Sequence, residues 1–198
     1  KDLFLLTDIG NYSLEYKLRG AINHTSPNDL IMELKDGIGA CNFHAKNINI
    51  IMPLLYAGRQ HRRNTRENLM CGMMLRELDS ISRIKSFITF DAHDQGVEHA
   101  IQHMEFDNFF PTYQFLKAFL KNVPDFKLDN DHLMIISPDE GAMSRAVYFS
   151  NILGVDMGMF YKRRDYSTIV NGKNPIVAHE FLGDSVEGKD VIIIDDMI

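Results

Sequence analysis

The chain has 198 residues, of which 45% are apolar and 24% charged, as in an ordinary globular protein. Its formal net charge of −6 excludes the basic footprint of a non-specific nucleic-acid binder. No apolar run reaches the roughly 18 residues that a membrane-spanning helix needs, so we expect no membrane partner. The two cysteines, Cys41 and Cys71, form no CxxC pair, which favours reduced, buried thiols in a cytoplasmic protein. Because the chain begins at Lys1 without a signal-peptide pattern, we expect a fragment cut at both ends.

The first predicted elements are a strand, a loop and a helix. Residues 2–8 predict a short buried strand. Residues 8–27 contain Gly, Asn and Pro without a clear period, and they predict a long loop. A helix should begin near Ser26-Pro27, because the apolar residues that follow recur at helical spacing. Those residues are Leu30, Ile31, Leu34 and Ile38.

Two further strands are predicted at 47–55 and 84–90, with a helix at 67–78 between them. The helix should bury one stripe of apolar residues, at positions 69, 70, 73, 74 and 78.

Side chains capable of chemistry follow both of these strands. Arg59, Gln60 and His61 belong to a basic turn after the first strand. Arginine presents a planar fork of donors that suits phosphate oxygens, although such a turn is more often only solvated. His93 follows the second strand and is flanked by acids. It could ligate or contact a metal-bound nucleotide, whereas a lone histidine is more often structural.

The second half begins with a predicted helix at 113–119 and a polar connection at 124–131. A strand at 132–137 and a helix at 144–153 follow, and the helix should end at Gly154. The order strand–helix–strand–helix thus occurs on both sides of the chain's midpoint, which predicts two similar α/β halves.

A strand at 155–161 leads into three consecutive cations, Lys162, Arg163 and Arg164. Side chains two apart on a strand share a face, so Lys162 and Arg164 should project together and Arg163 should point away. Three cations in a row are usually a solvated surface, and only their place after an apolar strand favours a site. Residues 165–179 predict a mobile flap or hairpin beside it.

The last predicted strand runs from Asp190 into a run of four β-branched apolar residues, which suits a strand covered on both faces. Asp195 and Asp196 follow it. Ligands of open α/β sheets bind at the carboxyl ends of the strands. Neighbouring strand residues point to opposite faces, so both acids reach one ligand only if the chain already turns there. A solvated acidic end is an equally good interpretation of this stretch alone.

Taken together, short motifs in this order resemble those of the ribose-phosphate pyrophosphokinases, also called phosphoribosyl pyrophosphate synthetases. The resemblance covers nearly the whole chain after about Asn28. Four positions depart from the family pattern: Gly58, His61, Asp94 and Ala142. Ala142 replaces a glycine and could alter its turn, because Ala tolerates positive φ poorly. The matching motifs are NDLIMEL at 28–34, RQ at 59–60, DAHD at 91–94, DN at 107–108, SPDEGA at 137–142, KRR at 162–164, VEGK at 186–189 and DVIIIDD at 190–196.

The resemblance implies two tandem phosphoribosyltransferase-like (Rossmann-like) α/β domains, each a mainly parallel sheet flanked by helices. Residues 1–110 would form an incomplete N-terminal domain with the ATP-binding motif. Residues 111–198 would form the start of the C-terminal domain, with the catalytic cations and the acid pair. The family's small-residue loop, which holds the sugar phosphate, would follow Ile198.

The resemblance also implies an enzyme of nucleotide biosynthesis that transfers the pyrophosphoryl group of ATP to ribose 5-phosphate. The products are phosphoribosyl pyrophosphate and AMP, and the family is a cytoplasmic homo-oligomer, a dimer or a hexamer, that needs Mg²⁺. By this resemblance the catalytic residues are Lys162 and Arg164, the ATP-binding residues Arg59, Gln60 and His93, the ribose-5-phosphate-binding residues Asp195 and Asp196, and the metal-site residues His93 and Asp139.

Two other functions stay open. A synthetase-like subunit that binds nucleotide or a partner enzyme without chemistry would fit the departures at His61, Asp94 and Ala142. A phosphoribosyltransferase would instead move the ribosyl group to a base. The Arg59-Gln60 motif and the second α/β half count against that alternative.

Overall fold

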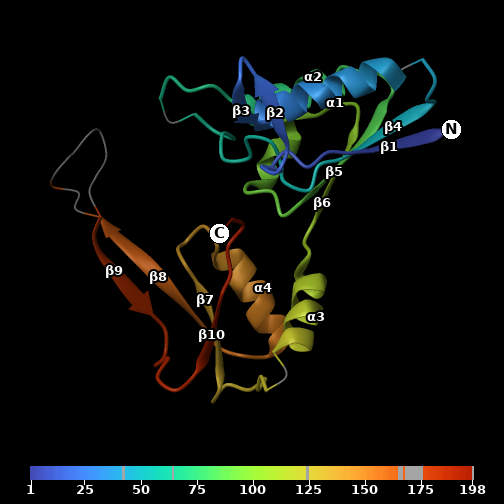
Figure 1. Ribbon diagram of the computed structural model, residues 1–198. Coiled ribbons are helices and arrows are strands. Elements are labelled where there is room, and N and C mark those ends of the chain that lie inside the picture. The colour runs from blue at the N-terminus through green and yellow to red at the C-terminus, as the bar shows by residue number, and fades with distance from the viewer. Residues whose placement is uncertain (42, 64, 124, 165–166, 168–175, 198) are drawn as a thin grey trace. The chain divides into compact units, whose positions relative to one another are not determined.

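The computed structural model describes residues 1–198 except 42, 64, 124, 165–166, 168–175 and 198. For residues 162–164 and 176–179 it describes the backbone but not the side chains. The chain divides into two compact units, Lys1–Pro111 and Thr112–Ile198, coloured blue to green and yellow to red in Figure 1. Among the described residues, no helix is both long and apolar enough to cross a bilayer.

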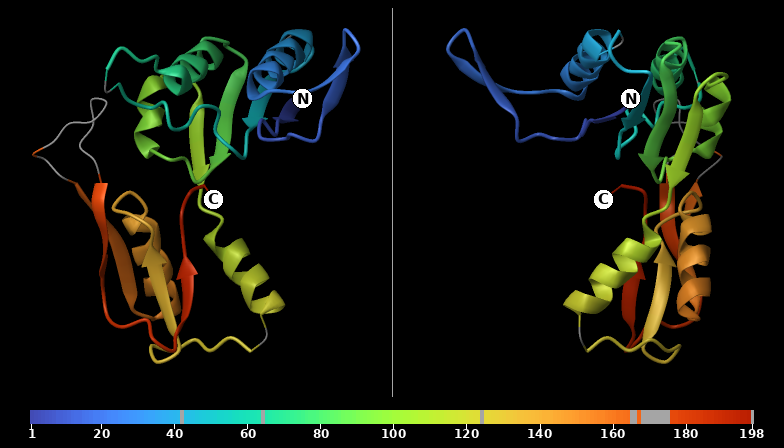
Figure 2. Two further views of the ribbon diagram at one scale, coloured as in Figure 1. Left: turned by 60° about the vertical axis from the view of Figure 1, so that its left-hand side comes forward. Right: turned by 90° about the vertical axis from the view of Figure 1, so that its right-hand side faces the viewer.

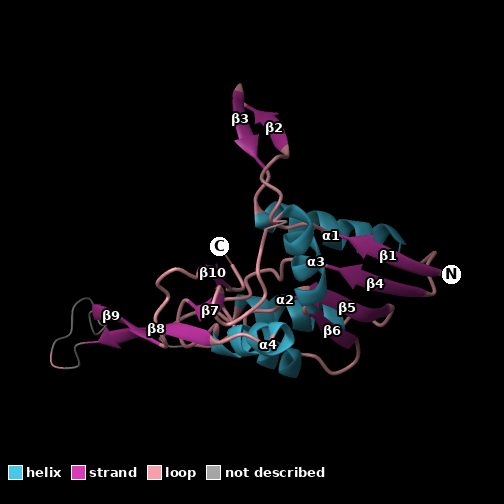
Figure 3. Cartoon of the chain, turned by 90° about the horizontal axis from the view of Figure 1, so that it is seen from below, coloured by secondary structure: helices cyan, strands magenta, loops and turns pink. Residues whose placement is uncertain are grey.

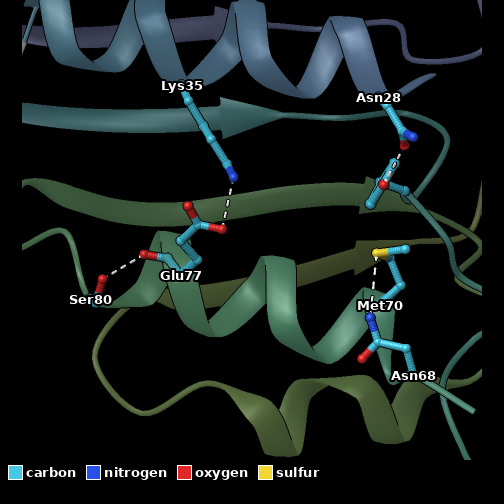
Figure 4. Close-up of polar contacts among 7 residues, drawn as sticks. Asn28, Lys35, Asn68, Met70, Glu77 and Ser80 are labelled. Atoms are coloured by element: carbon cyan, nitrogen blue, oxygen red, sulfur yellow. Dashed lines mark hydrogen bonds and ion pairs between the residues drawn. The ribbon is translucent and has the colours of Figure 1, made fainter. Parts of the chain in front are cut away.

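The first unit is built on a parallel sheet with strand order β1-β4-β5-β6. Each crossover steps the chain in the same direction across the sheet, so right-handed connections place the helices on one face. α1 and α2 lie side by side there, linked by Lys35 Nζ and Glu77 Oε2 at 2.8 Å (Figure 4). The strands are β1 (Asp2–Leu6), β4 (Asn47–Ile51), β5 (Ile84–Phe90) and β6 (Glu105–Phe109), and the helices are α1 (Pro27–Cys41), α2 (Met70–Asp79) and the 3₁₀ helix η1 (Gln95–Ala100).

Helix α1 begins where the sequence predicts and buries the predicted stripe of four apolar residues. Its start is fixed by a reciprocal cap. The Ser26 N–H donates to Asp29 Oδ2 at 2.8 Å, and the Asp29 N–H donates to Ser26 Oγ at 3.3 Å. The backbone and hydroxyl donors of Ser26 lower the pKa of Asp29. Such a capping box satisfies donors that the first helical turn leaves without partners.

A β-hairpin occupies the stretch for which a long loop was predicted, and that prediction is wrong. β2 (Glu15–Leu18) pairs antiparallel with β3 (Ala21–His24), and the hairpin projects from the sheet (Figure 3). Its two-residue turn is Arg19-Gly20, with φ of 51° and 84°. Positive φ at both turn positions matches the right-handed twist of the strands. The exposed hairpin carries no buried stripe that would have revealed it in the sequence.

Three further predictions for this unit need correction. β1 is an edge strand instead of a buried one, with Phe4 and Leu6 60% and 71% exposed. β4 ends at Ile51, before Pro53, because proline cannot donate to the ladder. α2 begins at Met70, and its buried stripe includes the predicted Met74 and Leu78 but has Cys71 and Leu75 as its other apolar members, while Met73 is 50% exposed. Burial raises the pKa of the Cys71 thiol to about 11, in keeping with a buried, inert cysteine.

Asp79, at the end of α2, is a buried carboxylate that anchors the loop after η1. Its Oδ1 accepts hydrogen bonds from the backbone N–H groups of His103 and Met104, both at 2.8 Å. Its Oδ2 accepts one from Gln102 at 2.9 Å. Burial raises the pKa of Asp79, but the three N–H donors and the nearby His103 outweigh burial and leave the pKa lowered. The loop that leads into β6 therefore depends on one ionised side chain.

We expect Asp79→Ala to lower the free energy of unfolding by about 3 kcal/mol at neutral pH, because three backbone N–H groups, one of them that of buried Met104, lose a charged acceptor. Since the folded-state pKa is lowered, this contribution is present above the unfolded-state pKa of about 3.9 and is lost as the pH falls through the folded-state value. Urea unfolding at pH 7 and pH 3 measures both effects. Exposed Asp184 provides the control, and a cost for Asp79→Ala no larger than for Asp184→Ala would contradict the anchor.

The second unit is a sheet with order β10-β7-β8-β9, in which β9 alone runs antiparallel among the described strands. Helix α4 lies along one face of the sheet (Figure 2), and its Ala146 and Phe149 pack on Leu133 and Ile135 of β7. α4 ends at Gly154 as predicted, with φ of 67°. The elements are α3 (Thr112–Asn122), β7 (Leu133–Ser137), α4 (Met143–Leu153), β8 (Met157–Arg164), β9 (Ile176–Leu182) and β10 (Asp190–Ile193).

Strand β10 forms where the sequence predicts, but the prediction that both its faces are covered is wrong. Val191 and Ile193 are 40% and 58% exposed, and β10 pairs only with β7 among the described residues. The strand buried along its whole length is β7, its neighbour. An apolar run alone cannot distinguish an edge strand from a central one, because both need a hydrophobic face.

Candidate functional site

In the first unit, the turn with Arg59 and Gln60 follows β4 at the carboxyl edge of the parallel sheet. The Gly58 N–H donates to Leu55 O at 3.1 Å, and the Gln60 N–H donates to Ala57 O at 2.8 Å. Ala57 takes a φ of 52°, a conformation that a residue with a Cβ rarely adopts. The Arg59 and Gln60 side chains are exposed at this edge, where they can meet a ligand.

Tyr56 fixes the start of this turn. Its ring is buried, and its hydroxyl donates to Asn28 Oδ1, at the beginning of α1, at 2.6 Å (Figure 4). The NDLIMEL helix and the turn with Arg59 are therefore connected by a hydrogen bond that sequence reasoning missed.

His93 lies in the turn after β5, at the same edge of the same sheet, and is exposed. The residues on both sides of it are held by hydrogen bonds. The Ala92 N–H donates to Asn108 Oδ1 at 3.0 Å. Asp94 Oδ1 accepts from the Gly96 N–H at 2.7 Å. The predicted ATP-binding residues of this unit thus come from the ends of adjacent strands.

His61 joins these two turns, and nothing in the sequence indicated that it would. Its Nε2 lies 3.2 Å from Asp94 Oδ2, and its ring centroid lies 5.3 Å from that of His93. Its side chain is only 11% exposed. His61 Nδ1 is buried without a hydrogen-bond partner among the described residues, as is Asn108 Nδ2.

In the second unit, three carboxylates lie at the carboxyl ends of the adjacent parallel strands β7 and β10. Asp139 Oδ1 accepts from the N–H groups of Gly141 at 2.9 Å and Ala142 at 3.3 Å. β10 ends at Ile193, so Asp195 and Asp196 lie where the chain already turns. Asp195 Oδ1 accepts from the Asp196 N–H at 2.8 Å. Burial raises the pKa of Asp195, and the negative charges of Asp196 and Asp139 raise it further. The three acids therefore share one electrostatic environment.

The three cations lie on β8 where it extends past the end of β7. Ser137, the last residue of β7, pairs with Met159, so the backbone of Lys162 lies three residues, about 10 Å, farther along. There it pairs with His179 of β9. Figure 1 shows β8 and β9 side by side. A register shift between Arg163 and Arg164 leaves the extra residue on β9, because Arg163 pairs with Ala178 and Arg164 with Ile176. The shift therefore does not itself break the alternation along β8 behind the prediction that Lys162 and Arg164 share a face. That prediction concerns side chains outside the described ones. β9 confirms a hairpin over part of 165–179, and residues 165–166 and 168–175 of that segment lie outside the described residues.

Within the described part of the chain, no group of three or more His, Cys, Asp and Glu side chains is arranged to hold a metal ion. His93 and Asp139, the residues predicted to share Mg²⁺, belong to different units. Their common site stays a prediction. Either residue would supply at most part of a coordination shell, with the remainder from substrate phosphates and water, the mode of binding that Mg²⁺ favours.

No family model matches the chain. Among curated proteins, the ribose-phosphate pyrophosphokinase of Helicobacter hepaticus is 31% identical over 86% of this chain and 51% of its own length. That of Ureaplasma parvum is 29% identical over 86% of this chain and 48% of its own. Ribose-phosphate pyrophosphokinase 2 of Enterococcus faecalis is 29% identical over 94% of this chain and 56% of its own.

The chain is a homologue of the ribose-phosphate pyrophosphokinases. It spans about half the length of these curated relatives. Among solved structures, phosphoribosylpyrophosphate synthetase from Mycobacterium smegmatis matches with a TM-score of 0.70 at 19% identity, over 92% of this chain and 62% of the other. The predicted α/β fold class is confirmed.

All four departures from the pyrophosphokinase motifs can be described in the structure. His61 and Asp94, which depart at separate motifs, form a pair with each other. Ala142 has φ of −87° and ψ of −2°, so no positive φ is needed there, and the expectation that it could alter the turn is wrong. Gly58 has no positive φ either, and a Cβ there would lie 3.3 Å from Leu55 O, a tight contact. The departures therefore leave the turns intact.

Proposed function

We propose that the protein containing this chain transfers the pyrophosphoryl group of ATP to ribose 5-phosphate. One observation carries the proposal: in each unit, predicted site residues lie at the carboxyl ends of adjacent parallel strands, where open α/β folds bind ligands. Arg59, Gln60 and His93 follow adjacent strands of one sheet, and the three acids follow adjacent strands of the other. The named activity of the relatives supplies the chemistry that these residue types support.

In this reaction the anomeric hydroxyl oxygen of ribose 5-phosphate attacks the β-phosphorus of ATP. The bond from the β-phosphorus to the oxygen it shares with the α-phosphate breaks, and AMP leaves with that oxygen. Phosphoryl transfer depends on positioning and charge neutralisation more than on covalent help. Arg59, Gln60 and His93 would orient the triphosphate. Lys162 and Arg164 would neutralise charge on the transferred group.

Asp195 and Asp196 would accept hydrogen bonds from the ribose hydroxyl groups. The raised pKa of Asp195 supports this role, because burial and the negative charges of Asp196 and Asp139 disfavour its ionised form. Hydroxyl donors or a divalent cation would relieve that repulsion on binding.

Mg²⁺ would bind between the ATP phosphates and the His93 imidazole or the Asp139 carboxylate, and it would withdraw charge from the transferred group. We expect Mg²⁺ to bind the nucleotide-free protein weakly and to bind tightly only with ATP, because no described cluster offers a full shell. Titration calorimetry with and without a non-hydrolysable ATP analogue measures the difference. Tight Mg²⁺ binding without nucleotide would contradict this expectation. Unchanged binding and turnover in His93→Ala would remove His93 from the site.

The decisive assay incubates the full-length protein with ATP, Mg²⁺ and ribose 5-phosphate and measures AMP and phosphoribosyl pyrophosphate. Equal formation of both products supports the proposal. ATP binding without turnover would indicate a non-catalytic subunit, and consumption of phosphoribosyl pyrophosphate with a free base would indicate a phosphoribosyltransferase. By analogy with the family we also propose a cytoplasmic homo-oligomer, which light scattering after size-exclusion chromatography and cell fractionation would test.

A further inference from the structure

The turn with Arg59 and Gln60 and the turn with His93 are separate loops after separate strands. A site that uses both must hold them in a fixed relation, since a misplacement of about 1 Å can cost 10²-fold in rate. Their backbone hydrogen bonds are mostly internal to each turn. Two described side-chain contacts of His61 join the two turns: its Nε2 lies 3.2 Å from Asp94 Oδ2, and its ring centroid lies 5.3 Å from that of His93.

Both members of the His61–Asp94 pair lie where they can fix the two turns relative to each other. His61 directly follows Gln60, and Asp94 directly follows His93. Asp94 is itself fixed, because its other oxygen accepts the Gly96 N–H and caps η1. His61 is mostly buried against the His93 ring. Because Nδ1 of His61 has no partner among the described residues, Nε2 provides its polar attachment.

We propose that the His61–Asp94 pair positions the nucleotide site, by holding the Arg59–Gln60 turn against the His93 turn. The inference rests on the proposed function, because it assigns these turns to ATP. The pair acts through its neighbours: His61 and Asp94 are positioning residues and need not touch the nucleotide. Asn108 complements them by holding Ala92, on the other side of His93.

Isosteric substitutions separate the two nitrogens of His61. The amide nitrogen of Gln can replace Nε2 and donate to Asp94, whereas Asn reaches only the position of Nδ1. Asp94→Asn keeps the acceptor for the Gly96 N–H but turns an N–H₂ toward His61 Nε2, which can accept it only in the tautomer that leaves an unpaired N–H at the buried Nδ1. We therefore expect His61→Asn and Asp94→Asn to weaken ATP binding about tenfold, the effect of losing one hydrogen bond to a charged group. His61→Gln should keep the wild-type ATP affinity. His44→Asn, at an exposed histidine of the same unit, is the matched control.

Steady-state kinetics and amide hydrogen exchange on the full-length protein test the proposal together. In His61→Asn and Asp94→Asn, the KM for ATP should rise about tenfold while kcat and the KM for ribose 5-phosphate stay within about twofold. The double variant should be no worse than either single one, because both remove the same bond. Without nucleotide, the Gly58 and Gln60 amides should exchange faster in these two variants but not in His61→Gln.

Two outcomes would overturn the pair's role. Equal weakening by His61→Gln and His61→Asn, with unchanged amide exchange, would mean that the ring contacts the nucleotide directly. Wild-type ATP affinity and exchange in His61→Asn would mean that the pair positions nothing. If the wild-type protein fails to bind ATP, the proposed function fails, while the exchange data still decide whether the pair holds the two turns together.

Discussion

Replacing Lys162 or Arg164 by Ala should lower turnover by about 10²–10³-fold, the usual effect of removing one fixed donor aimed at transition-state charge. During the reaction, negative charge moves onto the oxygens around the β-phosphorus and onto the departing AMP. Cations positioned for that charge stabilise the transition state more than bound ATP, so kcat should fall while the KM for ATP changes little. Steady-state kinetics on both variants measure this.

Arg163→Ala and Lys121→Ala are the matched comparisons. Arg163 should matter less, acting through folding, and Lys121, an exposed residue of α3, should not matter. If Arg163→Ala proved the most damaging, the expected alternation of Lys162, Arg163 and Arg164 along β8 would be wrong. If no variant reduced turnover of an active enzyme, the assignment of chemistry to this segment would be wrong.

Asp195→Asn should lower turnover by about 10²-fold or more and yet raise the melting temperature of the ligand-free protein. The amide oxygen can still accept the Asp196 N–H, so the turn is kept while one negative charge disappears. Loss of a charged hydrogen bond that is specific to bound ribose accounts for the lost activity. Loss of repulsion from Asp196 and Asp139 accounts for the gained stability.

The pH dependence of this stability gain has a definite sign. A carboxyl group whose folded-state pKa is raised destabilises the folded state when it is ionised, at a pH above the folded-state pKa. This destabilisation disappears at a pH below the unfolded-state pKa of about 3.9, where the group is protonated in both states. The difference in melting temperature between Asp195→Asn and wild type should therefore be largest at neutral pH and shrink in acid. Scanning calorimetry from pH 7 to pH 4 measures it. A variant less stable than wild type at pH 7 would show that repulsion from Asp196 and Asp139 does not destabilise the folded state.

Local patterns predicted the elements whose information is local. The periodicity of α1 gave its buried face, and the run at Ile84–Phe90 gave the bounds of β5. Gly154 marked the end of α4 through its φ of 67°. Each depends on residues a few positions apart, which a single sequence displays directly.

What the sequence could not supply depends on neighbours that are distant in the chain. The apolar runs of β1 and β10 resemble those of β4 and β7, and only the strand order makes them edges. His61 and Asp94 look like two unrelated departures until β4 and β5 bring their turns together. The effect of Ala142 depended on a backbone angle that no pattern of residue types reveals.

The place of β10 beside β7 also has a consequence for how the second unit assembles. α4, β8 and β9 separate these two strands along the chain, whereas β8 and β9 are consecutive. Closing a longer loop costs more conformational entropy, so the β8–β9 pairing should form early and β10 should dock late. That late step brings Asp195 and Asp196 to Asp139. Since it gathers like charges near the surface, dissolved salt should screen their repulsion and accelerate the final stage of folding.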